Sequence, residues 1–272
     1  MTAPLPSFSS RGRLGRLFRT VRSSGRFTRA FRPATKQIFA RPADPLSVSL
    51  SYEIMRNGIG VLGLAFPIVL IVGGGVDHVQ ASLSAYYHFS RLHPGEYGAG
   101  TMRDVFVGML CAIGAFLFFY RGHSFPEDIA LNIAGVSAVL IALVPMDWPS
   151  PPPGHPVSMA ANVHYLCAGL FFVMIAYVCV FRARDTLCIV KSPRRRRAFA
   201  RIYLVFGILM LATPITVATL EFLGPFAGYR YSTMVIEVAG VLVFAAFWLI
   251  KGFEIRSSLQ PVFALEHGDT GT

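Results

Sequence analysis

Six long apolar segments divide the 272-residue chain and restrict what it can fold into. A helix needs about 20 residues to cross the hydrocarbon core of a bilayer, and in lipid only helices or closed barrels satisfy their own backbone hydrogen bonds. The segments are continuously apolar, whereas a membrane strand would alternate apolar with polar residues. They therefore predict membrane-spanning helices at approximately 57–76, 104–120, 128–145, 161–181, 202–223 and 232–250.

The composition agrees with this fold class. Hydrophobic residues make up 54% of the chain and charged residues 14%, whereas a soluble domain carries about 25% charged residues. We therefore predict an all-α integral membrane protein with a six-helix transmembrane bundle at residues 51–256. Residues 1–50 form a basic N-terminal tail, and residues 257–272 are expected to be a disordered C-terminal tail.

The basic residues lie almost entirely on one side of this predicted bundle. Twenty-two of the 25 Lys and Arg residues fall in the N-terminal tail, the second and fourth connections, and the C-terminal end. Positively charged loops stay in the cytoplasm. Both termini are therefore predicted to be cytoplasmic, and a bacterial inner (plasma) membrane is the expected location.

The Arg-rich N-terminal tail has more than one interpretation. It either lies as an amphipathic helix on anionic lipid headgroups or is a disordered basic tail, and its composition is also typical of an organelle transit peptide. Nucleic acid is not favoured as a partner, because membrane topology alone explains the net charge of +11. A homo-oligomer is compatible with the sequence.

Polar residues within the predicted spans gather near the outer ends of the helices. Ionisable residues in a membrane are costly and mark functional sites. Apart from Asp128, which opens the third span at its inner end, no acidic or His residue lies in the predicted inner half of a span, so a single polar layer is expected. The predicted ligand pocket contains Tyr86, Tyr87, His88, Asp104, His164, Glu221 and Glu237.

Helical spacing favours an inward orientation for part of this set. Asp104 is followed by Gly108, Cys111 and Ala115 on one helix face, and small residues in membrane helices mark close packing between helices. Each residue also has a structural explanation. Asp104 suits a helix N-terminus, His164 could be a hydrogen-bonded packing residue and Glu221 could reach the headgroups.

Glu237 is the hardest of these residues to explain structurally. It lies among apolar neighbours, where a bare carboxylate would be expensive. It is therefore expected to be protonated, paired with a basic residue or bound to a cation.

The segment SLSAYYH contains Ser84 and His88 at the S-x-x-x-H spacing, and Asp104 lies on the next predicted helix. Over about 21 residues this resembles the opening of the alkaline ceramidase and adiponectin-receptor superfamily of membrane hydrolases. The resemblance implies a zinc ion surrounded by a Ser, an Asp and three His, and cleavage of lipid amides. Apart from the resemblance, His88, Asp104, His164 and Glu237 offer nitrogen and oxygen ligands that suit zinc. The chain departs from that family because the late H-x-x-x-H motif is absent and six spans replace seven.

Three classes of function follow from the sequence. Because no catalytic motif is complete, we predict a non-catalytic ligand-binding or partner-binding protein, a sensor or an assembly factor, with an outward-facing polar pocket. A proton-coupled or cation-coupled transporter of small solutes and a zinc-dependent lipid hydrolase remain as alternatives.

Overall fold

The structure is a computed structural model that describes residues 45–92, 99–149, 155–222 and 231–267. This part of the chain is helical and contains no strand. Six of its helices are long and apolar enough to cross a membrane, which confirms an all-α membrane protein with six spans. The chain divides into two compact units, Met1–Ser49 and Leu50–Thr272, and all six candidate spans belong to the second.

The helices follow one another through short connections. The six long helices are α3 (Pro45–Gly74), α5 (Ala99–Phe119), α6 (Phe125–Leu143), α7 (Met159–Tyr177), α8 (Pro193–Phe222) and α9 (Ser232–His267). Five short elements cover their ends: η2 (Val76–His78), η3 (Ser84–His88), α4 (Phe89–Leu92), η4 (Val178–Arg182) and η5 (Asp185–Ile189).

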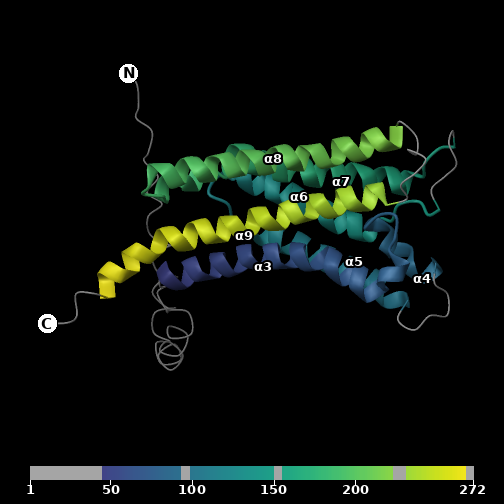
Figure 1. Cartoon of the computed structure of the whole chain (residues 1–272), viewed down its shortest axis with the longest axis horizontal. Helices are drawn as coiled ribbons and strands as arrows, with labels where there is room; N and C mark the ends of the chain where they lie inside the picture. Colours follow the sequence, from purple (N-terminus) through teal and green to yellow (C-terminus); the bar gives the residue numbers. More distant parts are fainter. Residues whose placement is uncertain (1–44, 93–98, 150–154, 223–230, 268–272) are drawn as a thin grey trace, which may run out of the picture. The chain divides into compact units, whose positions relative to one another are not determined.

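Neighbours in sequence are neighbours in the bundle. Helices α5, α6, α7, α8 and α9 each pack against the next, and α3 lies along α9 (Figure 1). Helix α3 also contacts α5, where the rings of Phe66 and Phe106 are 5.8 Å apart. The order along the chain is therefore also the order around the bundle.

Glycines allow the closest of these contacts. A Cβ at Gly114 of α5 would lie 2.7 Å from the carbonyl oxygen of Gly135 in α6, and a Cβ at Gly135 would lie 2.6 Å from the carbonyl oxygen of Gly114. In lipid, helices associate through packing rather than through burial of apolar surface from water. These two glycines therefore determine how closely α5 and α6 approach.

Helix α5 buries a different face from the one predicted. Its buried positions are occupied mainly by large residues, namely Met102, Phe106, Leu110, Ile113 and Leu117. Asp104, Gly108 and Ala115 lie on the exposed face. The prediction that Asp104 faces the bundle interior is wrong. Except for Gly114, the buried face of α5 carries large residues and not small ones.

Helix α9 is longer than the predicted span. It continues to His267, through residues that we expected to be disordered. Extending an existing helix adds one hydrogen bond per residue without repeating the cost of nucleation. Residues 268–272 lie outside the described part of the chain.

The bundle has two chemically distinct ends. At one end, α3, α6 and α8 begin and α5 and α7 finish, and this end carries the exposed arginines of the 182–201 region. We call it the basic end. At the opposite end, the segment from η2 to α4 folds across the helices, and Met234 donates its backbone N–H to Ala81 O over 3.0 Å.

Candidate functional site

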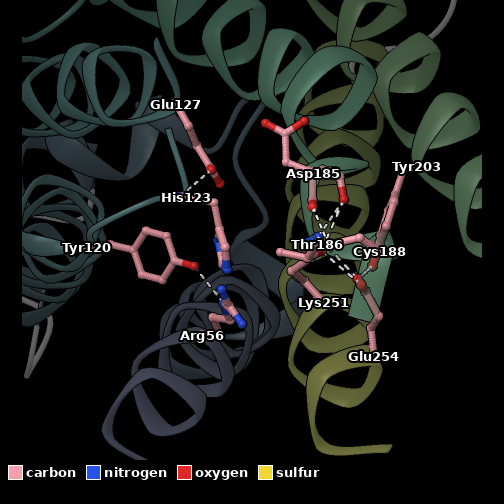
Figure 2. A network of polar contacts seen from close by, with 11 residues as sticks. Arg56, Tyr120, His123, Glu127, Asp185, Thr186, Cys188, Tyr203, Lys251 and Glu254 are labelled. Atoms are coloured by element: carbon pink, nitrogen blue, oxygen red, sulfur yellow. Dashed lines mark hydrogen bonds and ion pairs between the residues drawn. The ribbon is translucent and has the colours of Figure 1, made fainter. Parts of the chain in front are cut away.

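A buried ion pair lies at the basic end (Figure 2). Lys251 Nζ is 3.1 Å from Glu254 Oε2, one turn further along α9. The two residues are only 3% and 1% exposed. Lys251 also donates to Ala183 O over 2.6 Å and to Thr186 Oγ1, so its three N–H groups are all used.

Glu254 is held by side chains of η5 and α8 and by Lys251 of its own helix. It accepts hydrogen bonds from Thr186 of η5, over 2.8 Å, and from the Tyr203 hydroxyl of α8. Lys251 Nζ also lies 4.7 Å from the Tyr203 ring centroid. The pair therefore joins α9 to α8 and to the connection after α7, and this fully bonded arrangement is what a buried charge requires.

A second group of polar residues lies beside this pair. The Arg56 Nε–H donates to the Tyr120 hydroxyl over 2.7 Å, and the Arg56 guanidinium carbon is 5.3 Å from the Tyr120 ring centroid. Glu127 Oε2 accepts the backbone N–H of His123 over 2.7 Å. In Figure 2 the His123 ring points toward the Arg56 guanidinium. The two groups of residues occupy the same end of the bundle.

Electrostatics tie these groups together. Burial raises the pKa of Tyr120 to about 12, although the neighbouring Arg56 charge opposes the rise. His123 is exposed as a residue, but partial desolvation of its ring lowers its pKa, and the positive charges of Arg56 and Lys251 lower it further. The pKa of His123 is therefore lowered by a cation from each group, so the two groups are close enough to interact electrostatically.

The sequence did not reveal this site, and it predicts one polar layer at the other end. Three of its residues lie just at or beyond the ends of the predicted apolar segments: Arg56, Lys251 and Glu254. The two basic residues among them are explained, in the sequence, as charges that keep a connection in the cytoplasm. Burial of Lys251 and Glu254 depends on η4 and η5, which place Ala183 and Thr186 against α9. The i, i+3 spacing of Lys251 and Glu254, next to the apolar run, was the available signal.

His164 is the centre of the polar contacts at the opposite end. It is 3% exposed, its Nδ1 lies 2.7 Å from Val144 O, and its Nε2 lies 3.0 Å from Ser84 Oγ. A carbonyl oxygen only accepts, so Nδ1 carries the proton and Nε2 accepts the Ser84 hydroxyl hydrogen. The chain of bonds joins η3, α7 and the α6–α7 connection.

His88 and Glu237 fasten the same segment. The buried His88 Nε2–H donates to Met146 O over 2.9 Å, and the half-buried Glu237 Oε2 accepts the Leu83 backbone N–H over 2.6 Å. Both contacts hold the η2–α4 segment on the bundle. A backbone amide is none of the states expected for Glu237, which were a protonated carboxyl, a pair with a basic residue or a bound cation.

The remaining predicted pocket residues are dispersed. Tyr86 is buried and stacks on Phe89 at 5.5 Å, and burial raises its pKa. The hydroxyl of Tyr87 accepts from Arg103 Nη2 over 2.9 Å at an exposed position. The side chain of Glu221 lies outside the described part of the structure.

The four predicted zinc ligands are not brought together. No group of three or more His, Cys, Asp or Glu residues that could hold a metal ion is found in the described residues. Asp104 is exposed on α5, while His88 and His164 use ring nitrogens on backbone carbonyls. These observations correct the prediction that His88, Asp104, His164 and Glu237 form one metal site.

Two grooves mark the surface of the described residues. One of about 430 Å³ lies at the basic end and is lined by Arg184, Leu187, Pro193, Arg196, Arg197 and Ala200. The other, of about 380 Å³, is apolar and lies at the opposite end between α3 and α9, along Ile71, Val76, Val79, Tyr231, Met234, Val235 and Val238. Neither groove is lined by the predicted pocket residues.

Comparison with protein-family models, with curated proteins and with solved structures finds no match to this chain.

Proposed function

We propose that this chain is a non-catalytic, multi-pass protein of a plasma membrane that binds an anionic ligand at its basic end. The positive-inside rule supports an orientation in which the basic end and both termini face the cytoplasm, in a bacterial inner membrane. The ligand-binding class is the one that the sequence favours, but the buried charges of the basic end replace the outward-facing pocket as its site.

Arg56 is the observation that carries this proposal. Its side chain is 2% exposed, and a guanidinium has five N–H donors. Only the Nε–H has a partner in the described part of the chain, the neutral hydroxyl of Tyr120, and the terminal nitrogens are not fully enclosed. The ion pairs of that part join Arg121 to Asp128, Arg182 to Asp185, Lys251 to Glu254 and Arg256 to Glu53, and none includes Arg56.

A buried cation without an ion-pair partner is costly. The nearby carboxylates are engaged elsewhere, because Glu254 is bound by Thr186, Tyr203 and Lys251 and Glu127 by the backbone of His123. The planar end of a guanidinium matches a carboxylate or a phosphate through paired hydrogen bonds. Such an anion would complete the hydrogen bonding of Arg56.

A second hydrogen-bond donor near Tyr120 also has no acceptor within the described part of the chain. The Trp248 ring lies edge-on at 5.2 Å from the Tyr120 ring, and its enclosed Nε1–H has no hydrogen-bond partner among the described residues. His123 is exposed, and its ring points toward the Arg56 guanidinium (Figure 2). An oxygen-rich anion therefore suits this position better than a cation does.

The two alternatives receive less support. Proton or cation transport requires ionisable groups along a path, yet 57–74, 105–119, 129–143, 165–181, 202–220 and 238–250 contain no Asp, Glu, His, Lys or Arg. A zinc hydrolase requires at least three ligands around one ion, and the described residues do not bring such a group together.

Trp248 provides a local test of the proposal, because the chain has only one other tryptophan, Trp148. In a Trp148→Phe background in detergent, inorganic phosphate should change Trp248 fluorescence in a saturable way that chloride at equal ionic strength does not reproduce. Arg56→Gln should abolish the change. Arg201→Gln, which removes an exposed charge on α8, should preserve it.

The outcome depends on folded protein, so each variant is compared by gel filtration and circular dichroism. A folded Arg56→Gln variant that responds to phosphate like its parent would contradict the proposal, as would no response in the parent. Arg56→Lys keeps the charge but loses the paired hydrogen bonds, and it should bind more weakly than the parent.

Orientation is tested separately with cysteine labelling. Cys188 is exposed at the basic end, and His155 is exposed at the opposite end. In intact cells a membrane-impermeant maleimide should label a His155→Cys variant that carries Cys188→Ser. Cys188 should react only after permeabilisation, and the reverse pattern would refute the orientation.

A further inference from the structure

The groove at the basic end combines positive charge with an apolar floor. Arg184, Arg196 and Arg197 are exposed along it, and none of them forms an ion pair within the described residues. Leu187, which is 3% exposed, and Ala200 provide apolar surface between the arginines. The volume of about 430 Å³ is large enough for a headgroup and the start of an acyl chain.

The groove lies where two candidate spans meet the membrane surface. One candidate span finishes at Ile189, and the next begins at Pro193. The arginines between and beside these positions therefore lie at headgroup depth when the helices cross a bilayer. Basic pockets between membrane helices at this depth are typical binding sites for acidic lipid headgroups.

An apolar stripe continues from the groove along α8. Ala200 is followed at four-residue intervals by Leu204 and Ile208, so the three share one face of the helix. Leu204 and Ile208 are 38% and 57% exposed. A chain lying on this stripe would run from the arginines toward the middle of the bilayer.

We propose that this groove binds one anionic phospholipid, whose phosphate contacts Arg184, Arg196 and Arg197 and whose acyl chain follows Ala200, Leu204 and Ile208. The arginines supply paired hydrogen bonds to phosphate oxygens, and the apolar stripe explains why a lipid fits better than free phosphate. The inference goes beyond the proposed function, because the groove does not include Arg56. It shares only the requirement that the basic end lies at a membrane surface.

The test is native mass spectrometry of the full chain in detergent with added lipid. Dioleoyl phosphatidylglycerol should remain bound as one molecule per chain, whereas dioleoyl phosphatidylcholine, which has the same acyl chains but no net charge, should not. The variant R184Q/R196Q/R197Q should bind the anionic lipid roughly a hundredfold more weakly, because each basic residue near a membrane surface contributes about fivefold.

A second triple variant controls for net charge. R121Q/R194Q/R201Q removes three exposed arginines that do not line the groove, and it should retain the lipid. Equal loss in both triple variants would overturn the proposal in favour of general charge attraction. Equal binding of the two lipids by the parent protein would also overturn it.

Glycerol phosphate separates a lipid site from a headgroup site. Glycerol phosphate carries the phosphate without acyl chains, so it should compete only weakly with phosphatidylglycerol. The I208N variant should bind the lipid more weakly, whereas glycerol phosphate should compete with the lipid as it does in the parent protein. Full competition at similar concentrations would refute the lipid assignment. The Trp248 response to phosphate should persist in R184Q/R196Q/R197Q, so this proposal and the Arg56 proposal can fail independently.

Discussion

Lys251 and Glu254 form a buried ion pair one helical turn apart, with 3.1 Å between Nζ and Oε2. Their remaining hydrogen bonds go to Ala183, Thr186 and Tyr203, which belong to other helices or connections. The pair therefore organises the basic end, on which both the Arg56 site and the arginine groove depend.

Removing one member of this pair should destabilise the protein strongly. Lys251→Met leaves Glu254 buried without its cation, and breaking a buried pair in this way costs about 3–5 kcal/mol. Arg256→Met removes a cation whose side chain is 65% exposed and which lies 3.7 Å from Glu53, so it should cost about 1 kcal/mol or less.

Unfolding in mixed micelles of increasing denaturing detergent measures both effects. Adding Glu254→Gln to Lys251→Met should recover part of the loss, because the uncompensated charge is removed. Equal stability of Lys251→Met and Arg256→Met would show that the pair is not important for folding.

The packing of α5 on α6 gives a second prediction. Gly114→Ala places a Cβ 2.7 Å from the Gly135 carbonyl oxygen, and overpacking of this kind costs about 1–3 kcal/mol. Gly108→Ala, on the same helix, meets nothing within 4 Å and should be neutral or slightly stabilising. Thermal unfolding in detergent should separate the two variants, and similar midpoints would argue against close α5–α6 contact.

At the opposite end, Ser84→Ala should weaken the attachment of η3. The substitution leaves the Nε2 acceptor of the buried His164 without its partner, which costs about 1–3 kcal/mol. Ser90→Ala provides a control two residues beyond His88. Hydrogen exchange should increase around residues 76–92 in the first variant alone, and no difference between the two would contradict the assigned hydrogen bond.

His123 should make stability depend on pH. Its pKa in the folded protein lies below the ordinary value of 6.5, so the unfolded chain binds the proton more readily. This contribution to stability is complete above pH 6.5 and is lost as the pH falls through the lower folded pKa. His123→Gln should reduce the decrease in unfolding midpoint between pH 7.5 and 5.5, and an unchanged pH profile would contradict the lowered pKa.

The spans could be predicted from sequence because hydrophobic length is a local property. Which side of a helix is buried is not local. Asp104 and Gly108 suggested an interior face of α5, but Phe106 and Leu110 occupy the packed side. In lipid both faces of a helix are apolar, so amphipathic periodicity gives little information about the buried face.

Buried charge was also hidden from the sequence. Lys251 resembles an interfacial anchor until η5 places Thr186 against it. Arg56 belongs by its position to the residues that determine topology, although its partner Tyr120 is 64 positions away. Such pairings depend on tertiary structure, which hydropathy and charge counts do not contain.

Equilibrium dialysis of the purified protein against radiolabelled inorganic phosphate tests the central proposal most directly. We expect phosphate to bind at Arg56 in the parent protein, in R184Q/R196Q/R197Q and in Arg201→Gln, and we expect a folded Arg56→Gln variant to lose that binding. Phosphate binding that is unchanged in Arg56→Gln, or no saturable binding in the parent, would contradict an anion site at the basic end.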